Sequence, residues 1–181
     1  MSTSTAPTGR THTVIDSPYG PLTLVAEGER LVGLYMEAQR HRPEESRFGE
    51  RLPGATVAPF VEAARQLAEY FDGRRDTFDL PLTLHGTAFQ QRVWAALREI
   101  PIGETWTYGE LAQYIGQPTA SRAVGLANGK NPIGVIVPCH RVVGSDGSLT
   151  GYGGGLERKQ ALLVHEHAVP ADSDGQQTLG F

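Results

Sequence analysis

The sequence is poor in cysteine, with Cys139 as the only one among 181 residues. A single sulfur excludes an internal disulfide and a cysteine-rich zinc site. Cys139 is therefore either a small buried apolar residue or a nucleophile. One cysteine, together with a start that lacks the apolar segment of a secretion signal, fits a reducing compartment, so we expect a cytoplasmic protein.

Long hydrophobic runs are also missing. No apolar stretch approaches the roughly 20 residues that cross a bilayer, so no membrane partner is expected. The composition, 39% apolar and 20% charged, is that of an ordinary globular chain. The length allows one ordinary domain or two small ones.

The chain has no excess of basic residues, and its formal net charge is -4. That balance argues against a nucleic-acid-binding protein, which is normally basic. The deficit lies in residues 1–85, with 9 basic and 12 acidic side chains, whereas residues 86–168 carry 7 and 6. The second part can therefore approach phosphates if its arginines cluster, with modest affinity and a weak dependence on salt.

Residues 13–85 have the pattern of a small α/β domain with an antiparallel sheet, preceded by a disordered tail at 1–12. Alternating apolar residues predict strands, turns rich in Pro and Gly join them, and a 3.6-residue apolar period predicts a helix. In order, the pattern predicts strands at 13–16, 22–26 and 31–36, a charged loop at 39–55, a helix at 57–71 and a strand at 78–82.

Residues 86–168 have mainly helical patterns and form a second expected domain, followed by a disordered tail at 169–181. The expected helices run from Thr87 to about Ile100, over 107–116, from Thr119 or Ser121 to Asn128, and over 162–167. The second and third of these are joined by a turn containing Gly116 and Pro118, which is the form of a helix-turn-helix. Plain packing of two helices is the other interpretation of this pair.

The helix that ends at Asn128 has one face of small residues. At about 100° per residue, one side gathers Ala120, Ala123, Val124 and Ala127, and the other gathers Ser121, Arg122, Gly125 and Gly129. A conventional major-groove reader presents long polar side chains instead. The small face suits close approach to a narrow groove with Arg122 inserted, or else tight packing against another helix.

Several motifs in the second part resemble the O6-alkylguanine-DNA alkyltransferases, also called methylated-DNA-protein-cysteine methyltransferases. The most specific element is Val137-Pro138-Cys139-His140-Arg141-Val142. It is accompanied, in order and at close spacing, by Phe89-Gln90-Gln91-Arg92-Val93-Trp94, Gly103-Glu104-Thr105, Arg122-Ala123-Val124-Gly125, Asn131-Pro132 and Gly151-Tyr152-Gly153-Gly154-Gly155. The similarity extends to Glu166 and, more weakly, back to Asp16-Ser17-Pro18, so only the two tails lie outside it.

The resemblance implies a ribonuclease-H-like first domain and a second domain of the winged helix-turn-helix type. It also implies that an alkyl group moves irreversibly from O6 of a guanine in double-stranded DNA to Cys139, once per protein molecule. Displacement at a saturated carbon needs a polarisable nucleophile, and a thiolate meets that need. In an extended segment, His140 would point away from Cys139. In the family a water bridges the two, and Glu166 matches the carboxylate that orients the histidine.

Other positions receive roles by the same resemblance. Asn131 matches the asparagine that orders the cysteine region, and Tyr108 matches the tyrosine that donates to the target base. Arg122 matches the arginine that replaces the flipped base, on a DNA-binding helix that includes Ser121, Ala123 and Gly125. The implied substrate pocket consists of Val142, Tyr152, Gly153 and Gly154.

Some features of the family are missing. The first domain has no cysteine for the structural zinc of some relatives, and His165 and His167 lack a third ligand, so neither a metal nor a cofactor is expected. Relatives that sense damage without repair replace the cysteine that is present here. We expect a monomer and leave open its clustering on DNA. Two other functions stay possible from the residues: a non-catalytic module that binds alkylated DNA, and a thiol hydrolase using Cys139 and His140.

Overall fold

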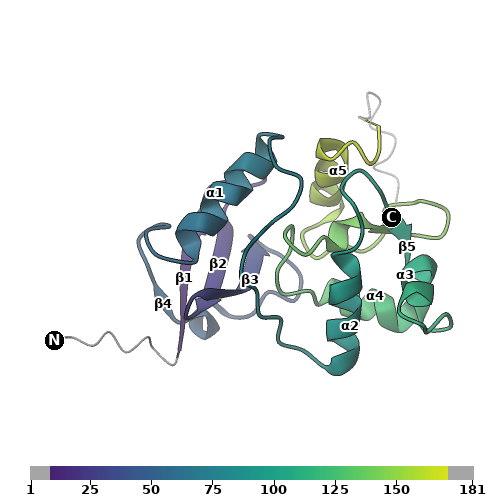
Figure 1. Cartoon of the computed structure of the whole chain (residues 1–181), viewed down its shortest axis with the longest axis horizontal. Helices are drawn as coiled ribbons and strands as arrows, with labels where there is room; N and C mark the ends of the chain where they lie inside the picture. The colour runs from purple at the N-terminus through teal and green to yellow at the C-terminus, as the bar shows by residue number, and fades with distance from the viewer. Residues whose placement is uncertain (1–8, 171–181) are drawn as a thin grey trace. The chain divides into compact units, whose positions relative to one another are not determined.

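The computed structural model describes residues 9–170, and the predicted tail segments 1–8 and 171–181 lie outside them. The chain forms two compact units (Figure 1). Unit 1 contains the residues up to Ala38 together with Arg42–His85, and unit 2 contains Gln39–His41 and the residues from Gly86 onward. The predicted α/β class, with two small domains, is confirmed.

Unit 1 is built on a sheet with the strand order β3-β2-β1-β4. Strands β1 (Arg10–Ile15), β2 (Leu22–Glu27) and β3 (Arg30–Met36) form the predicted antiparallel meander. The two-residue strand β4 (Glu50–Arg51) pairs with β1 in parallel, so the sheet is mixed. The predicted tail over 1–12 is wrong for its last three residues, which belong to β1 because they pair with β2.

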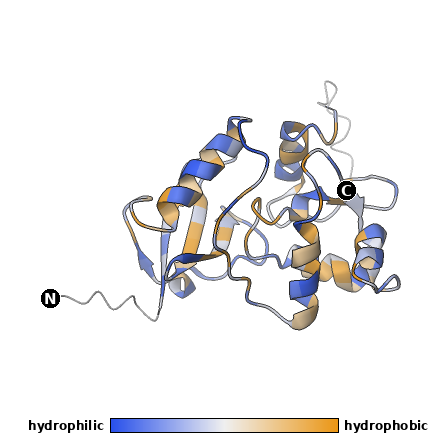
Figure 2. Cartoon of the chain, viewed as in Figure 1, coloured by the Kyte–Doolittle hydropathy of each residue, from blue (hydrophilic) through white to orange (hydrophobic). Residues whose placement is uncertain are grey.

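Both faces of β2 and β3 are buried. Helix α1 (Phe60–Phe71) lies along one face, and Figure 2 shows hydrophobic residues concentrated on the strands beside it. On the other face, Phe48 stacks on Tyr35 with ring centroids 5.3 Å apart. Phe48 belongs to a short 3-10 helix, η1 (Glu45–Phe48). The loop predicted at 39–55 is therefore partly structured, because its fully buried Phe48 completes this core.

The strand predicted at 78–82 is wrong. Only an isolated bridge joins Leu82 to Leu31. The amide of Leu31 donates to the carbonyl of Pro81, and the amide of Thr83 donates to the carbonyl of Leu31. Pro81 has no amide hydrogen, so this segment cannot extend a regular ladder.

Unit 2 is mainly helical, with α2 (Ala88–Leu97), α3 (Tyr108–Tyr114), α4 (Ser121–Gly129) and α5 (Leu156–His165). Reciprocal capping boxes start α2 at Thr87 and α3 at Thr107, which explains why both starts were predictable. The strands β5 (Trp106–Thr107) and β6 (Val142–Val143) pair in parallel. α3 and α4 pack together across the turn at Gly116, as a helix-turn-helix requires.

Within residues 9–170, no helix has the length and hydrophobicity needed to cross a membrane.

Candidate active site

Cys139 lies at the start of a 3-10 turn, η2 (Cys139–Arg141), and not in the extended segment that we predicted. The turn forms because Pro138 cannot donate to a strand partner, and its carbonyl accepts from the amide of Arg141 at 3.0 Å. Neighbouring side chains in such a turn are not forced onto opposite faces. The geometric reason for separating His140 from Cys139 therefore does not apply here.

The segment before Cys139 is held by Asn131. Its Nδ2 donates to the carbonyl of Val137 at 2.7 Å, and its Oδ1 accepts from the amide of Ile133 at 3.0 Å. Val135 between them has a φ of 68°, which is strained for a β-branched residue. The side chain of Asn131 thus supports an irregular backbone that delivers the cysteine, which is a positioning role.

The thiol is nearly buried, and it lines a small pocket within unit 2. Cys139 is 8% exposed. The pocket is lined by Gln39, Asn128, Gly129, Asn131, Gly134 and Cys139 together with residues 151–154, so it includes the predicted pocket residues Tyr152, Gly153 and Gly154. Most of these residues have small side chains, and the free space beside the sulfur is about 10 Å³, enough for about one water molecule.

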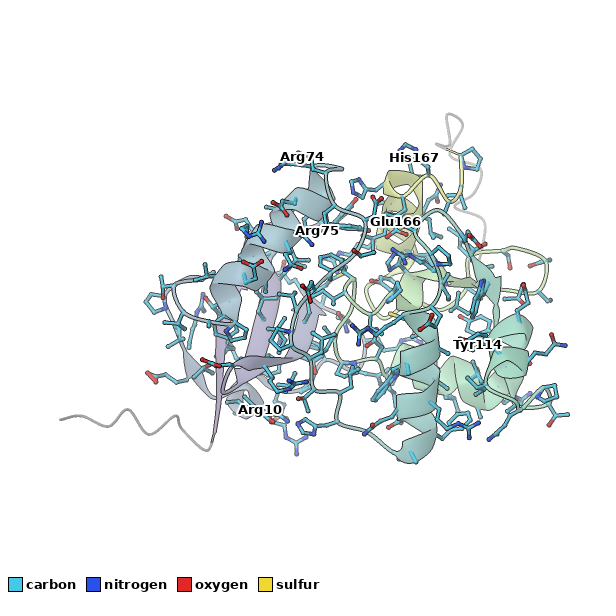
Figure 3. The ribbon with its side chains drawn as sticks, in the orientation of Figure 1. Arg10, Arg74, Arg75, Tyr114, Glu166 and His167 are labelled. Carbon is cyan, nitrogen blue, oxygen red and sulfur yellow. The ribbon has the colours of Figure 1, made fainter. Side chains whose placement is uncertain are left out.

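A buried ionic cluster lies next to the cysteine. Glu166, labelled in Figure 3, lies where α5 ends and is 3% exposed. Its Oε2 is 2.8 Å from Nε2 of His140, and Arg141 reaches both carboxylate oxygens, at 2.8 and 3.1 Å. Burial alone would raise the pKa of Glu166, but the hydrogen bonds and charges of His140 and Arg141 lower it to about 2. The carboxylate is therefore ionised and directs the imidazole.

His140 and Cys139 are both uncharged in this environment. Burial lowers the pKa of His140, and Glu166 only partly offsets this effect. Burial also raises the pKa of Cys139. With Nε2 bound to Glu166, the buried Nδ1 of His140 has no hydrogen-bond partner among the described residues. A neutral imidazole with one open nitrogen can accept a proton from a thiol, as a general base must.

Lys159 is a buried cation that the sequence analysis did not identify. Its side chain on α5 is fully buried, and its Nζ donates to the carbonyls of Val142 at 2.5 Å and Thr150 at 2.7 Å. Burial lowers the pKa of Lys159 to about 8, and Cys139 offsets part of this effect. After a hydrogen bond from Asn131, the positive charge of Lys159 is the next influence that lowers the pKa of Cys139.

We expect Lys159→Met to make the thiol harder to ionise. Removing a buried positive charge should move the pH profile of Cys139 alkylation by iodoacetamide about one pH unit upward. Lys130→Met removes an exposed charge at the end of α4 and should leave the profile in place. A profile for Lys159→Met that coincides with the unmodified protein would contradict this electrostatic role.

Tyr108 and Tyr152 stand close to the cysteine pocket. The hydroxyl of Tyr108 donates to the carbonyl of Thr150 at 3.1 Å, the same carbonyl that Lys159 contacts. The ring of Tyr152 lies edge-on to His140, with centroids 6.5 Å apart. Burial raises the pKa of Tyr108 and raises that of Tyr152 well above its usual value, so both hydroxyls stay protonated. Both therefore keep their protons, but the hydroxyl of Tyr108 must leave the carbonyl of Thr150 before it can donate to a ligand.

Two backbone carbonyls of the site already accept hydrogen bonds. The carbonyl of Val142 accepts from Lys159, and that of Cys139 accepts from Nδ2 of Asn128 at 3.3 Å. The carbonyl of Cys139 also accepts from the amide of Val142, so both of its lone pairs are occupied, whereas the carbonyl of Val142 has one lone pair left for a ligand. Asn128 was also missed by the sequence analysis, in which it served only as the end of a helix.

α4 exposes a different set of residues from the one we predicted. Val124 and Ala127 are buried, and Nε1 of Trp94 donates to the carbonyl of Ala127 at 2.8 Å. Ala123 is exposed beside Arg122, so its predicted place on the packing side is wrong. The outward face also does not consist of small residues beside Arg122 alone, because Leu126 is 66% exposed on it.

The predicted DNA-binding residues Ser121 and Gly125 are half-buried at the edge of this face. A Cβ at Gly125 would lie 3.6 Å from the ring of Tyr108. α4 therefore runs directly past the tyrosine of the site, and the structure brings Tyr108, Asn131, Cys139, His140 and Glu166 together in unit 2.

Within residues 9–170, no group of three or more His, Cys, Asp or Glu side chains is placed to hold a metal ion.

Two family models match the chain. The DNA-binding domain of 6-O-methylguanine DNA methyltransferase matches residues 88–168, and the ribonuclease-like domain of 6-O-methylguanine DNA methyltransferase matches residues 11–84. These matches fall on the two units of the structure. The buried thiol and its histidine lie in the part that matches the DNA-binding domain.

Named relatives agree with these models. A methylated-DNA–protein-cysteine methyltransferase of Mycobacterium tuberculosis is 55% identical over 159 residues, which cover 87% of this chain and 93% of the relative. One from Methanosarcina mazei is 59% identical over 156 residues, covering 84% and 94%.

Solved structures give the same result. The crystal structure of Mycobacterium tuberculosis O6-methylguanine methyltransferase matches with a TM-score of 0.79 and 54% identity, over 90% of this chain and 96% of that one. The structure of Mycobacterium tuberculosis OGT in complex with DNA matches with a TM-score of 0.79 and 53% identity, over 89% and 96%. The chain therefore belongs to the 6-O-methylguanine DNA methyltransferase family.

Proposed function

We propose that this protein repairs DNA directly, by moving an alkyl group from O6 of an alkylated guanine in double-stranded DNA to Sγ of Cys139. The observation that carries the proposal is the single thiol in a pocket of small residues, next to a histidine held by the buried Glu166. Membership of the 6-O-methylguanine DNA methyltransferase family supplies the substrate.

The reaction follows from the charges of the site. Nδ1 of His140 does not contact the sulfur directly, so the imidazole takes the thiol proton through a bridging water, and the ionised Glu166 stabilises the imidazolium that results. The sulfur then forms a bond to the alkyl carbon while the bond from that carbon to O6 breaks, and its electron pair moves to the guanine. The hydroxyl of Tyr108 turns from the carbonyl of Thr150 and donates its hydrogen bond to the departing base. The positive charge of Lys159 offsets the charge of the thiolate.

The product explains why each molecule acts once. The new bond is a thioether, which has no activated leaving group for a further displacement. Cys139 is the only cysteine of the chain, so no second thiol can accept the alkyl group. A lone thiol also requires a reducing environment, and we propose that the protein works in the cytoplasm.

The stoichiometry of transfer tests this function. Titrating the protein with a duplex oligonucleotide that carries a labelled O6-methylguanine should give a plateau at one methyl group per protein molecule. Repeated turnover would contradict the proposal. Binding without transfer would instead support a non-catalytic lesion-binding module.

α4 is proposed to enter the minor groove, with Arg122 occupying the space that the flipped base leaves. Arg122 is exposed, and no ion pair holds it among the described residues. Extruding a base costs a few kcal/mol, and an inserted side chain offsets part of that cost. The small residues around Arg122 allow the helix to approach a groove about 6 Å wide.

We expect Arg122→Ala to slow methyl transfer from duplex DNA by roughly 10- to 100-fold, because the extruded state loses its support. Transfer from the free base O6-benzylguanine needs no extrusion and should keep its rate. Single-turnover kinetics on both substrates measures the two effects. Arg98→Ala, at the end of α2, serves as the matched control with an exposed arginine. Equal losses on both substrates would contradict the insertion role.

A further inference from the structure

α4 carries an exposed leucine that the proposed function does not use. Leu126 is 66% exposed, and Figure 2 shows α4 largely in the colours of hydrophobic residues. Tyr114, which Figure 3 labels and which is 57% exposed, has a packing partner, because its ring centroid lies 5.1 Å from that of Trp106. Leu126 belongs neither to the core cluster around Phe48 nor to the one around Leu163.

The neighbours of Leu126 define the surface to which it belongs. Arg122 lies one helical turn before Leu126 on α4, and Lys130 is the capping residue just past the end of the helix, so the line from Arg122 to Leu126 leads toward Lys130. Among residues 9–170, neither cation has a carboxylate partner within ion-pair distance. Beside this line, a Cβ added at Gly129 would meet nothing within 4 Å. The surface thus consists of one exposed apolar side chain, with open space beside it, between two cations that have no ion-pair partner within the described part of the chain.

This order of side chains matches the cross-section of a DNA groove. Phosphates at the rims attract cations, and the sugar walls between them present carbon-bound hydrogens that accept apolar contact. One helical turn of about 5.4 Å separates Leu126 from Arg122. If Arg122 enters the base stack, Leu126 therefore lies beside the nucleotide next to the extruded one.

We propose that Leu126 contacts the deoxyribose wall of the minor groove next to the extruded base, and that it adds affinity that depends on neither base sequence nor salt. This inference rests on the proposed function. Beside the inserted Arg122, it assigns the binding of α4 to two separable parts: Lys130, which contacts phosphate, and Leu126, which displaces water from sugar. A second copy of the chain on the same face is the alternative partner.

Equilibrium binding separates these parts. In a Cys139→Ala background that cannot react, Leu126→Ala should weaken binding to a duplex with O6-methylguanine about five- to tenfold, because apolar contact area is lost. The slope of log Kd against log salt should not change. Lys130→Ala should weaken binding and reduce that slope by about 0.9, the value for one phosphate contact. Leu126→Met, which keeps the volume, should restore the affinity.

The same substitution in the reactive protein distinguishes binding from folding. Leu126→Ala should transfer the benzyl group from free O6-benzylguanine at the unmodified rate. An unchanged Kd for DNA, an equal loss with the free base, or altered self-association with normal DNA affinity would each overturn the inference. If the unmodified protein transfers no methyl from DNA, the proposed function fails as well. If the unmodified protein does transfer methyl from DNA, an unchanged Kd of Leu126→Ala for DNA contradicts only the role of Leu126 and leaves the proposed function standing.

Discussion

Cys139→Ala should abolish methyl transfer while leaving DNA binding intact. We expect the single-turnover rate to fall by more than about 10⁴-fold, because no other group in the site can attack a saturated carbon. Alanine fits the space of the nearly buried cysteine, and the hydrogen bonds of Asn131 and Asn128 go to backbone atoms that the substitution retains. A labelled-methyl assay measures transfer, and fluorescence anisotropy measures affinity for the methylated duplex.

A serine variant tests whether transfer needs a thiol in particular. Cys139→Ser replaces the thiol with a hydroxyl of similar size, whose proton is far less acidic than that of a thiol. We therefore expect no transfer from this variant either, with affinity within about twofold of the unmodified protein. Measurable methyl transfer by the alanine variant would show that another residue accepts the group.

Glu166→Gln should destabilise unit 2 and slow transfer together. Removing one partner of a buried ion pair leaves the other charge uncompensated, which costs about 3 kcal/mol or more. Here the charge left behind is the guanidinium of Arg141, which is 7% exposed. The imidazolium formed in the reaction also loses its counter-charge. Urea unfolding and single-turnover kinetics measure the two effects.

The pH dependence of stability follows from the same carboxylate. The pKa of Glu166 falls from 4.5 to about 2 on folding. Its contribution is therefore present above pH 4.5 and is lost as the pH falls toward 2. The pKa of His140 is also lowered, so its contribution is lost as the pH falls below 6.5.

The free energy of unfolding should thus decrease on acidification, and Glu166→Gln should flatten the part of the curve between pH 4.5 and 2. Glu157→Gln changes an exposed acid in the first turn of α5 and should alter stability by less than about 0.5 kcal/mol. If the free energy of unfolding falls as steeply between pH 4.5 and 2 in Glu166→Gln as in the unmodified protein, other groups dominate the loss of stability.

Local signals made much of the fold predictable. Thr87 and Thr107 indicate where their helices begin, because each forms a capping box with the residue three positions later. The first three strands follow from alternating apolar residues. The short parallel strand at 50–51 was missed because its pairing with β1 depends on distant residues and leaves no periodic signal.

In the site, too, the side chains whose surroundings depend on distant residues could not be predicted from local sequence. Cys139, His140 and Glu166 were predictable because the motifs around them are specific. Lys159 and Arg141 were not assigned roles, because a basic side chain ordinarily indicates a solvated surface. One signal for Lys159 was present: Lys159, Leu162, Leu163 and Glu166 repeat at the spacing of one helix face. Its full burial against two carbonyls depends on the tertiary structure alone.

The central claim is that an alkyl group ends on Cys139, and intact-protein mass spectrometry tests it most directly. After incubation with an excess of duplex DNA containing O6-methylguanine, the account predicts that the protein gains the mass of one methyl group in place of one hydrogen. Peptide mapping should place the gain on Cys139. An unchanged protein mass while the DNA is demethylated, or a methyl group on any other residue, would contradict the account.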